Sequence, residues 1–268
     1  MGSGIAEATA RAGYPTLVFD PNPSVIQSAE KNIETGLQKL VEKEKIAAGE
    51  KSSTLANLRF TTNIDDCKGD LVIEAIIEDL VIKQQLFLQL ANLNSRQTIL
   101  ASNTSSLSVS AIAEPLPYRE RVIGLHFFNP APVMKMVEII ETGWSSPDTT
   151  HTATSFIESL NKVPVLCKDF PGFIVNRVAR HYYLESLRLA EDGVADLETI
   201  DRVLESAGFK MGPFRLMDLI GNDVNLAVSR SMYEAFGKAE RFKPSILQEN
   251  KVSEGKLGRK TGKGFYNY

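Results

Sequence analysis

The segment Asp70-Leu-Val-Ile-Glu-Ala75 decides the fold class, because it is short and almost entirely apolar. Such a segment is typical of a β-strand that is buried on both faces of a sheet. Residues 80–93 then show helical periodicity, and Thr98-Ile-Leu-Ala-Ser102 is a second short apolar segment. A strand, a helix and another strand in this order predict a parallel sheet that is covered by helices.

The same alternation continues on both sides of this unit. Residues 24–47 are charged and helically periodic, with their apolar side chains on one face. Further strands are predicted at residues 16–20, 58–62, 121–126, 135–140 and 163–167. From Pro171 to about residue 250 the periodicity is helical with almost no strand signal, and Pro171 fits the first turn of a helix that ends near Asp192. We therefore predict an α/β domain over residues 1–169 and a helical domain over residues 170–268.

The composition excludes several classes of protein. The 268 residues carry a formal charge of −3 without a run of Lys or Arg, which argues against nucleic-acid or membrane-surface binding. No apolar stretch approaches the roughly 20 residues of a transmembrane helix, and the start is not a signal peptide. The two cysteines form no C-x-x-C pair, and the Cys and His spacings offer no ligand set for a metal. These features predict a cytoplasmic protein.

The first residues match the end of a dinucleotide-binding loop. Such a unit normally runs strand, G-x-G-x-x-G, helix, and Gly2 fits its last glycine because a helix rich in small residues follows. Asp20 then ends the next strand, where an acid binds the ribose hydroxyls and favours NAD over NADP. Packing and turn chemistry also produce these features, so they leave the cofactor open. A chain that starts at Met1 lacks the first strand and two loop glycines, which implies a cropped or misassigned start, or an impaired protein.

Two residues have the properties of an acid–base pair. His126 ends a predicted strand, at the edge where open α/β sheets bind their ligands, and histidine accepts protons near neutral pH. Glu138 lies within the apolar segment Met-Val-Glu-Ile-Ile and needs a partner if it is buried. A neighbouring imidazole would be that partner. The alternatives are a histidine satisfied in the core and a glutamate at the surface.

Two polar residues are further candidates for substrate binding. Ser105 follows a buried strand, where its hydroxyl would donate to a substrate oxygen or, equally well, cap a helix that starts near Leu107. Asn176 lies in the helix after Pro171, and asparagine is mildly unfavourable within a helix unless it has a tertiary partner.

Several motifs together resemble the L-3-hydroxyacyl-CoA dehydrogenase family along the whole chain. They are Ser102-Asn-Thr-Ser-Ser-Leu107, Gly124-Leu-His-Phe-Phe-Asn-Pro130, Val133-Met-Lys-Met-Val-Glu138, Asp169-Phe-Pro-Gly-Phe-Ile-Val-Asn-Arg177 and Lys210-Met-Gly-Pro213. Residues 218–225 and 257–265 resemble the bacterial 3-hydroxybutyryl-CoA and 3-hydroxyadipyl-CoA dehydrogenases within that family.

The resemblance implies a Rossmann-type doubly wound sheet, with its first strand absent from this chain, followed by an all-α domain. The implied activity is reversible, NAD-dependent oxidation of a short-chain (3S)-3-hydroxyacyl-CoA, such as 3-hydroxybutyryl-CoA, to the 3-oxoacyl-CoA. Alternatives are a 3-hydroxyadipyl-CoA dehydrogenase of aromatic catabolism, a CoA-independent hydroxy-acid dehydrogenase, and a structural or vestigial family member. The helical domain is expected to bind substrate and to form a homodimer.

The resemblance also implies roles for individual residues. His126 is the catalytic base, Glu138 is the acid paired with it, and Ser105 and Asn176 hold the substrate. Ser105 also contacts the nicotinamide. The remaining positions match residues that contact NAD in relatives, namely Glu78, Lys83 and Asn129, or CoA, namely Lys43. Gly36 departs from the family, because it replaces a serine that binds CoA in some relatives.

Overall fold

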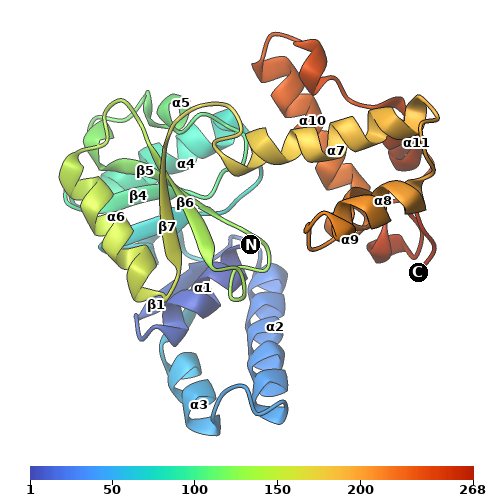
Figure 1. Ribbon diagram of the computed structural model, residues 1–268. Helices are drawn as coiled ribbons and strands as arrows, with labels where there is room; N and C mark the ends of the chain where they lie inside the picture. The colour runs from blue at the N-terminus through green and yellow to red at the C-terminus, as the bar shows by residue number, and fades with distance from the viewer. The chain divides into compact units, whose positions relative to one another are not determined.

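The computed structural model describes residues 1–268 and divides into two compact units, Met1–Asp169 and Phe170–Tyr268 (Figure 1). The first unit contains every β-strand, and the second is helical. None of the helices combines the length and hydropathy that crossing a bilayer requires.

The strands of the first unit form two sheets. They are β1 (Thr16–Phe19), β2 (Leu58–Thr61), β3 (Leu71–Glu74), β4 (Ile99–Ser102), β5 (Val122–Phe127), β6 (Met136–Glu141) and β7 (Val163–Lys168). The strands β1 and β2 pair in parallel, and the other five form one sheet in the order β3-β4-β5-β6-β7. Every predicted strand is present, within one residue of its predicted ends, because short apolar runs bounded by turn residues are strand signals.

The predicted parallel sheet contains one antiparallel pair. The strands β3, β4 and β5 run parallel, but β6 runs antiparallel to β5, and β7 is parallel to β6. Only residues 128–135 connect β5 to β6, and they contain no helix. A connection of this length joins antiparallel neighbours, whereas a parallel pair needs a longer crossover.

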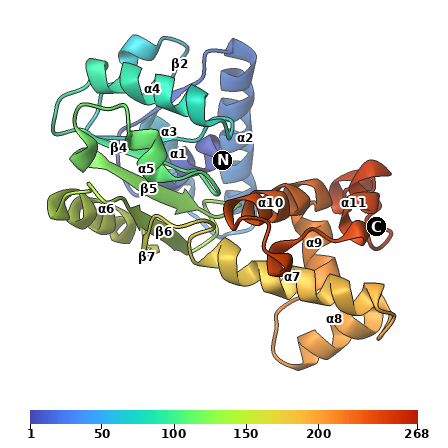
Figure 2. The same cartoon turned by 90° about the horizontal axis from the view of Figure 1, so that it is seen from above.

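The first unit contains six helices, some on the two faces of the five-stranded sheet and some on the β1–β2 pair. They are α1 (Gly2–Arg11), α2 (Pro23–Glu42), α3 (Ala48–Ala56), α4 (Leu80–Leu93), α5 (Val109–Ala113) and α6 (Pro147–Ser159). Figure 2 shows α4 and α5 on one face and α6 on the other. The core on the α6 side joins Ile157 to the central residues Ile123 and Ile139. The single helix predicted over residues 24–47 in fact ends at Glu42, because Glu44 adopts a positive φ of 53°, and α3 follows.

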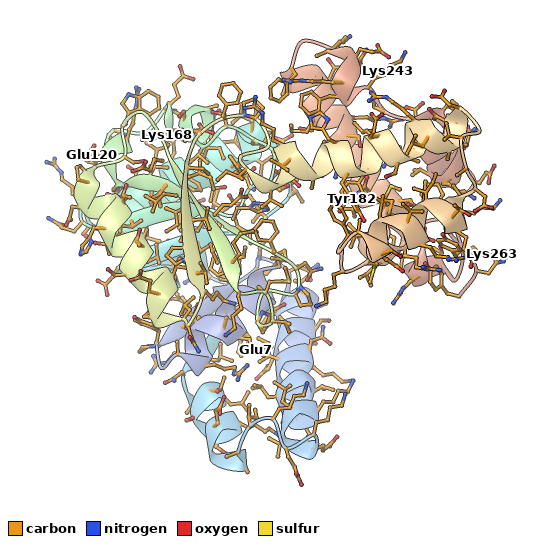
Figure 3. All side chains as sticks on the ribbon, in the orientation of Figure 1. Glu7, Glu120, Lys168, Tyr182, Lys243 and Lys263 are labelled. Carbon is orange, nitrogen blue, oxygen red and sulfur yellow. The ribbon has the colours of Figure 1, made fainter.

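The second unit packs its helices around an aromatic and aliphatic core. Its helices are α7 (Val175–Glu191), α8 (Leu197–Ser206), α9 (Pro213–Ile220), α10 (Asn222–Ala235) and α11 (Ile246–Ser253). Tyr182 of α7 lies within this unit (Figure 3) and donates its hydroxyl to the carbonyl of Met211 at 2.7 Å. The helix expected from Pro171 begins only at Val175, since Gly172 and Phe173 adopt φ values of 75° and 48° that a right-handed helix does not contain.

Candidate active site

Several candidate residues of the first unit, His126 and Ser105 among them, lie near one edge of the five-stranded sheet. Because β3, β4 and β5 are parallel, their carboxyl ends meet at the same edge, and the register places Glu74 opposite Ser102 and Ser102 opposite Gly124. His126 lies two residues beyond Gly124, and Ser105 lies three residues beyond Ser102. Ligands of open α/β sheets bind outside this edge.

His126 and Glu138 form a buried pair across two strands. They stand directly opposite each other in the antiparallel pairing of β5 and β6, and 2.7 Å separates His126 Nδ1 from Glu138 Oε2. The Glu138 side chain is 0% exposed. A carboxylate only accepts hydrogen bonds, so Nδ1 carries the proton and the neutral ring keeps its lone pair on Nε2. The pair therefore presents Nε2 as a base, with a negative charge behind the ring to stabilise its protonated form.

A thiol near this pair is held in its protonated form. Cys167 lies on β7 opposite Ile140 of β6. Burial, followed by the charges of Glu138 and Asp169, raises the pKa of Cys167 to about 12. The thiol is therefore protonated at neutral pH, and it supplies no thiolate nucleophile.

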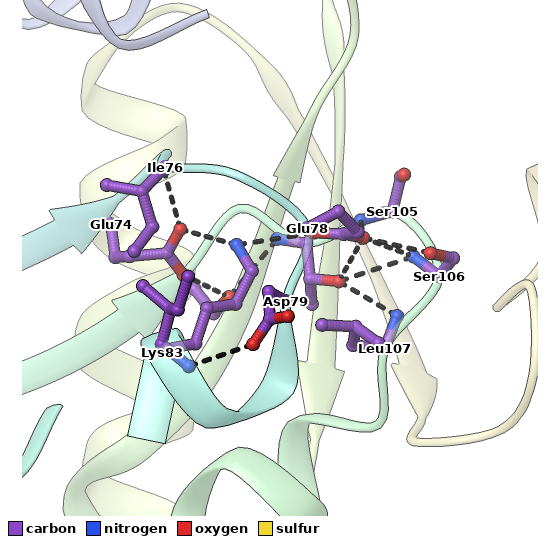
Figure 4. A network of polar contacts seen from close by, with 11 residues as sticks. Glu74, Ile76, Glu78, Asp79, Lys83, Ser105, Ser106 and Leu107 are labelled. Carbon is purple, nitrogen blue, oxygen red and sulfur yellow. Dashed lines mark hydrogen bonds and ion pairs between the residues drawn. The ribbon is translucent and has the colours of Figure 1, made fainter. Parts of the chain in front are cut away.

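Ser105 lies in a loop that is held by Glu78. The Oε1 atom of Glu78 accepts from the hydroxyl of Thr104 at 2.6 Å and from the backbone N–H of Ser105 and of Ser106 at 3.0 and 3.1 Å (Figure 4). Although partial burial raises the pKa of Glu78, these hydrogen bonds and the ammonium of Lys83 outweigh it and hold the pKa below the usual range. The cap of α5 is Ser108, which accepts from Ala111, so Ser105 does not serve as the helix cap.

Sequence reasoning missed Glu74, which lies behind Glu78. Lys83 Nζ is 2.5 Å from Glu74 Oε1 and 3.2 Å from Glu78 Oε2, and the Glu74 side chain is fully buried. An acid within the apolar segment 70–75 is the same signal that singled out Glu138, and it would have found Glu74 as well.

Two further candidates, Gly2 and Asp20, lie at the start of a helix and just after a strand. The helix α1 begins at Gly2, where an added Cβ would lie 3.8 Å from the Cβ of Ala75, just beyond the end of β3. Asp20 directly follows β1. A helix N-terminus attracts a pyrophosphate and a strand-end acid binds ribose hydroxyls, so these residues fit a dinucleotide.

The other candidates are more dispersed. Asn129 is exposed in the loop after β5. Lys43 is exposed at the end of α2, a helix about 30 Å long that starts near Asp20, so the structure does not bring Lys43 to the sheet edge. Asn176 belongs to the helical unit, as the second residue of α7.

Comparison with known proteins identifies both units. Residues 1–170 match the family model of the 3-hydroxyacyl-CoA dehydrogenase NAD binding domain, and residues 172–268 match that of the 3-hydroxyacyl-CoA dehydrogenase C-terminal domain. The chain belongs to the 3-hydroxyacyl-CoA dehydrogenase family. Its first unit is therefore the NAD-binding domain of this family, with NAD as the cofactor.

Relatives of this family match the chain along its whole length. It is 45% identical to the 3-hydroxyadipyl-CoA dehydrogenase of Escherichia coli K12, covering 100% of this chain but 57% of that protein. It is 40% identical to the human mitochondrial hydroxyacyl-coenzyme A dehydrogenase, covering 100% of this chain and 88% of that protein. The crystal structure of the E. coli K12 3-hydroxybutyryl-CoA dehydrogenase superposes with a TM-score of 0.96 at 45% identity, covering 100% of this chain and 57% of that one.

Proposed function

We propose that this protein catalyses the reversible, NAD-dependent oxidation of a (3S)-3-hydroxyacyl-CoA to the 3-oxoacyl-CoA, with short-chain esters such as 3-hydroxybutyryl-CoA as substrates. The buried His126–Glu138 pair carries this proposal, since it supplies a base at the carboxyl edge of an NAD-binding domain. The similarity to a protein named 3-hydroxyadipyl-CoA dehydrogenase favours that dicarboxylic ester as the second candidate.

In this proposal, two residues of the chain accept the proton of the reaction and stabilise the resulting charge. Oxidation of a secondary alcohol removes a proton from the hydroxyl and a hydride from the carbon that carries it. His126 accepts the proton on Nε2, and Glu138 stabilises the resulting imidazolium and keeps the ring in one orientation. Bound NAD supplies the acceptor for the hydride.

Other residues position the reacting groups in this proposal. Ser105 donates its hydroxyl to the substrate oxygen and contacts the nicotinamide, and Asn176 is assigned to substrate binding. Gly2, Asp20 and Asn129 contribute to NAD binding. Lys43 contacts CoA in this proposal. The helical unit forms the homodimer, and the protein acts in the cytoplasm.

The test is the oxidation of NADH with acetoacetyl-CoA and, in parallel, with 3-oxoadipyl-CoA. We expect His126→Ala to lower kcat by about 100-fold or more, because it removes the base. The matched control is His151→Ala, which removes an exposed histidine of α6 and should leave turnover intact. Near-normal turnover by His126→Ala would contradict the role of the pair, and a folded wild-type protein that is silent with both esters would overturn the proposed function.

A further inference from the structure

Glu74 is a buried carboxylate that the proposed mechanism does not use. It ends β3, its side chain is 0% exposed, and it stands opposite Ser102 in the register of β3 and β4. Burying a carboxylate is costly unless charged and hydrogen-bonding partners compensate it. Its partners extend in two directions, and both directions end on the loop that carries Ser105.

The first direction runs through Lys83. Glu74 Oε1 accepts from Lys83 Nζ at 2.5 Å and from the backbone N–H of Ile76 at 2.7 Å. The same Nζ lies 3.2 Å from Oε2 of Glu78, whose other oxygen accepts the backbone N–H groups of Ser105 and Ser106 (Figure 4). Lys83 therefore bridges Glu74 to the carboxylate that holds the Ser105 loop.

The second direction runs through Ser102. Its hydroxyl donates to Glu74 Oε2 at 2.7 Å, and Ser102 Oγ itself accepts the backbone N–H of Thr104 at 3.2 Å. Thr104 Oγ1 in turn accepts the N–H of Leu107 at 2.9 Å. The backbone N–H groups of four consecutive residues, 104 to 107, thus all bind side-chain oxygens of this network.

These bonds replace regular secondary structure in the Ser105 loop. The strand β4 ends at Ser102 and α5 begins at Val109, so no strand or helix fixes the backbone between them. Asn103 connects the loop to β5, because its Oδ1 accepts the backbone N–H of Phe127, the residue after His126. The loop is therefore held by side chains on one side and by the strand of His126 on the other.

The Lys83 side chain is fixed by burial and by two ion pairs. It is 1% exposed, and its ammonium lies between two carboxylates. Without the charge of Glu74, the buried ammonium would have Glu78 as its one remaining carboxylate partner, and it would draw Glu78 away from the N–H groups of Ser105 and Ser106. The Ser102 hydroxyl would at the same time lose the acceptor that orients it.

We propose that Glu74 is a positioning residue for catalysis, which fixes the Ser105 loop through Lys83 and Glu78 and through Ser102. This inference rests on the proposed function, because it assigns Ser105 to substrate and nicotinamide contact. It also makes Lys83 a structural support of Glu78.

The inference is tested by measuring the effect of Glu74→Gln on kcat in the wild-type protein and in the S105A variant. We expect this variant to lower kcat by about 10-fold or more, since small misplacements of a positioning group cost this much. Combined with S105A, the same substitution should change kcat by less than about 2-fold, because both act on one contact. The matched control is Asp218→Asn, which removes another buried carboxylate, one that accepts from Phe265 and Tyr266 in the helical unit. Its effect should be the same with and without S105A.

Hydrogen exchange provides a readout that does not depend on activity. In Glu74→Gln, and to a smaller degree in Ser102→Ala, the amides of residues 104–107 should exchange faster than in the wild type, while those of β5 should not change. Unchanged exchange in both folded variants would overturn the inference, as would a kcat effect of Glu74→Gln that is equally large with S105A. A wild type that is inactive with both esters would overturn the proposed function instead, and faster exchange at 104–107 would still support the positioning contacts.

Discussion

The charge of Glu138 can be separated from its shape by a single substitution. Glu138→Gln keeps an acceptor for His126 Nδ1 at the position that is now 2.7 Å away, but it removes the negative charge behind the ring. The imidazolium is then less stable, so we expect kcat to fall by about 10-fold or more and the acidic limb of the kcat/KM profile to move to lower pH. NAD affinity should stay nearly constant, because Glu138 is buried between strands.

The control for this experiment lies on the same strand. Glu141→Gln removes the charge of a residue that binds Lys168 and Thr150 instead of a histidine, and its pH–rate profile should match the wild type. If the profile of Glu138→Gln also coincides with the wild type, Glu138 does not support the base.

At the level of elements, Glu78 joins the segment between β3 and α4 to the loop between β4 and α5. Because the folded protein lowers the pKa of Glu78, its stabilising contribution is present above the ordinary glutamate pKa of about 4.3 and is lost as the pH falls through the lower, folded value. Urea unfolding should therefore show a larger stability deficit of Glu78→Gln at pH 7 than at pH 3.5. Glu30→Gln, at an exposed site on α2, should change the free energy of unfolding by the same small amount at both pH values. A deficit of Glu78→Gln that does not shrink in acid would contradict this linkage.

Elements that depend on local sequence could be predicted, whereas features that depend on contacts between distant segments could not. Apolar runs such as 70–75 and 98–102 predicted their strands from local composition, although of these two only β4 is buried along its whole length and three of the four residues of β3 are half-buried. The direction of β6 was not predictable from its own residues, since it depends on the connection and on the partner β5. The acid Glu74 was visible in its strand, but its link to Ser105 depends on two loops that are far apart in the sequence and adjacent in the fold.

The whole molecule is expected to be a homodimer formed by the helical unit. Leu219, Ile220 and Val224, at the junction of α9 and α10, are 48%, 42% and 47% exposed, and exposed apolar side chains grouped in this way mark interaction surfaces. Sedimentation should therefore give about twice the chain mass of 29.6 kDa at micromolar concentration. Val224→Glu should shift the protein towards the monomer, because it places a charge within the contact. Val163→Glu, which changes a more exposed valine on β7 of the other unit, should remain dimeric. A monomeric wild type would refute the dimer, and a dimer that survives Val224→Glu would move the contact to another face of the helical unit.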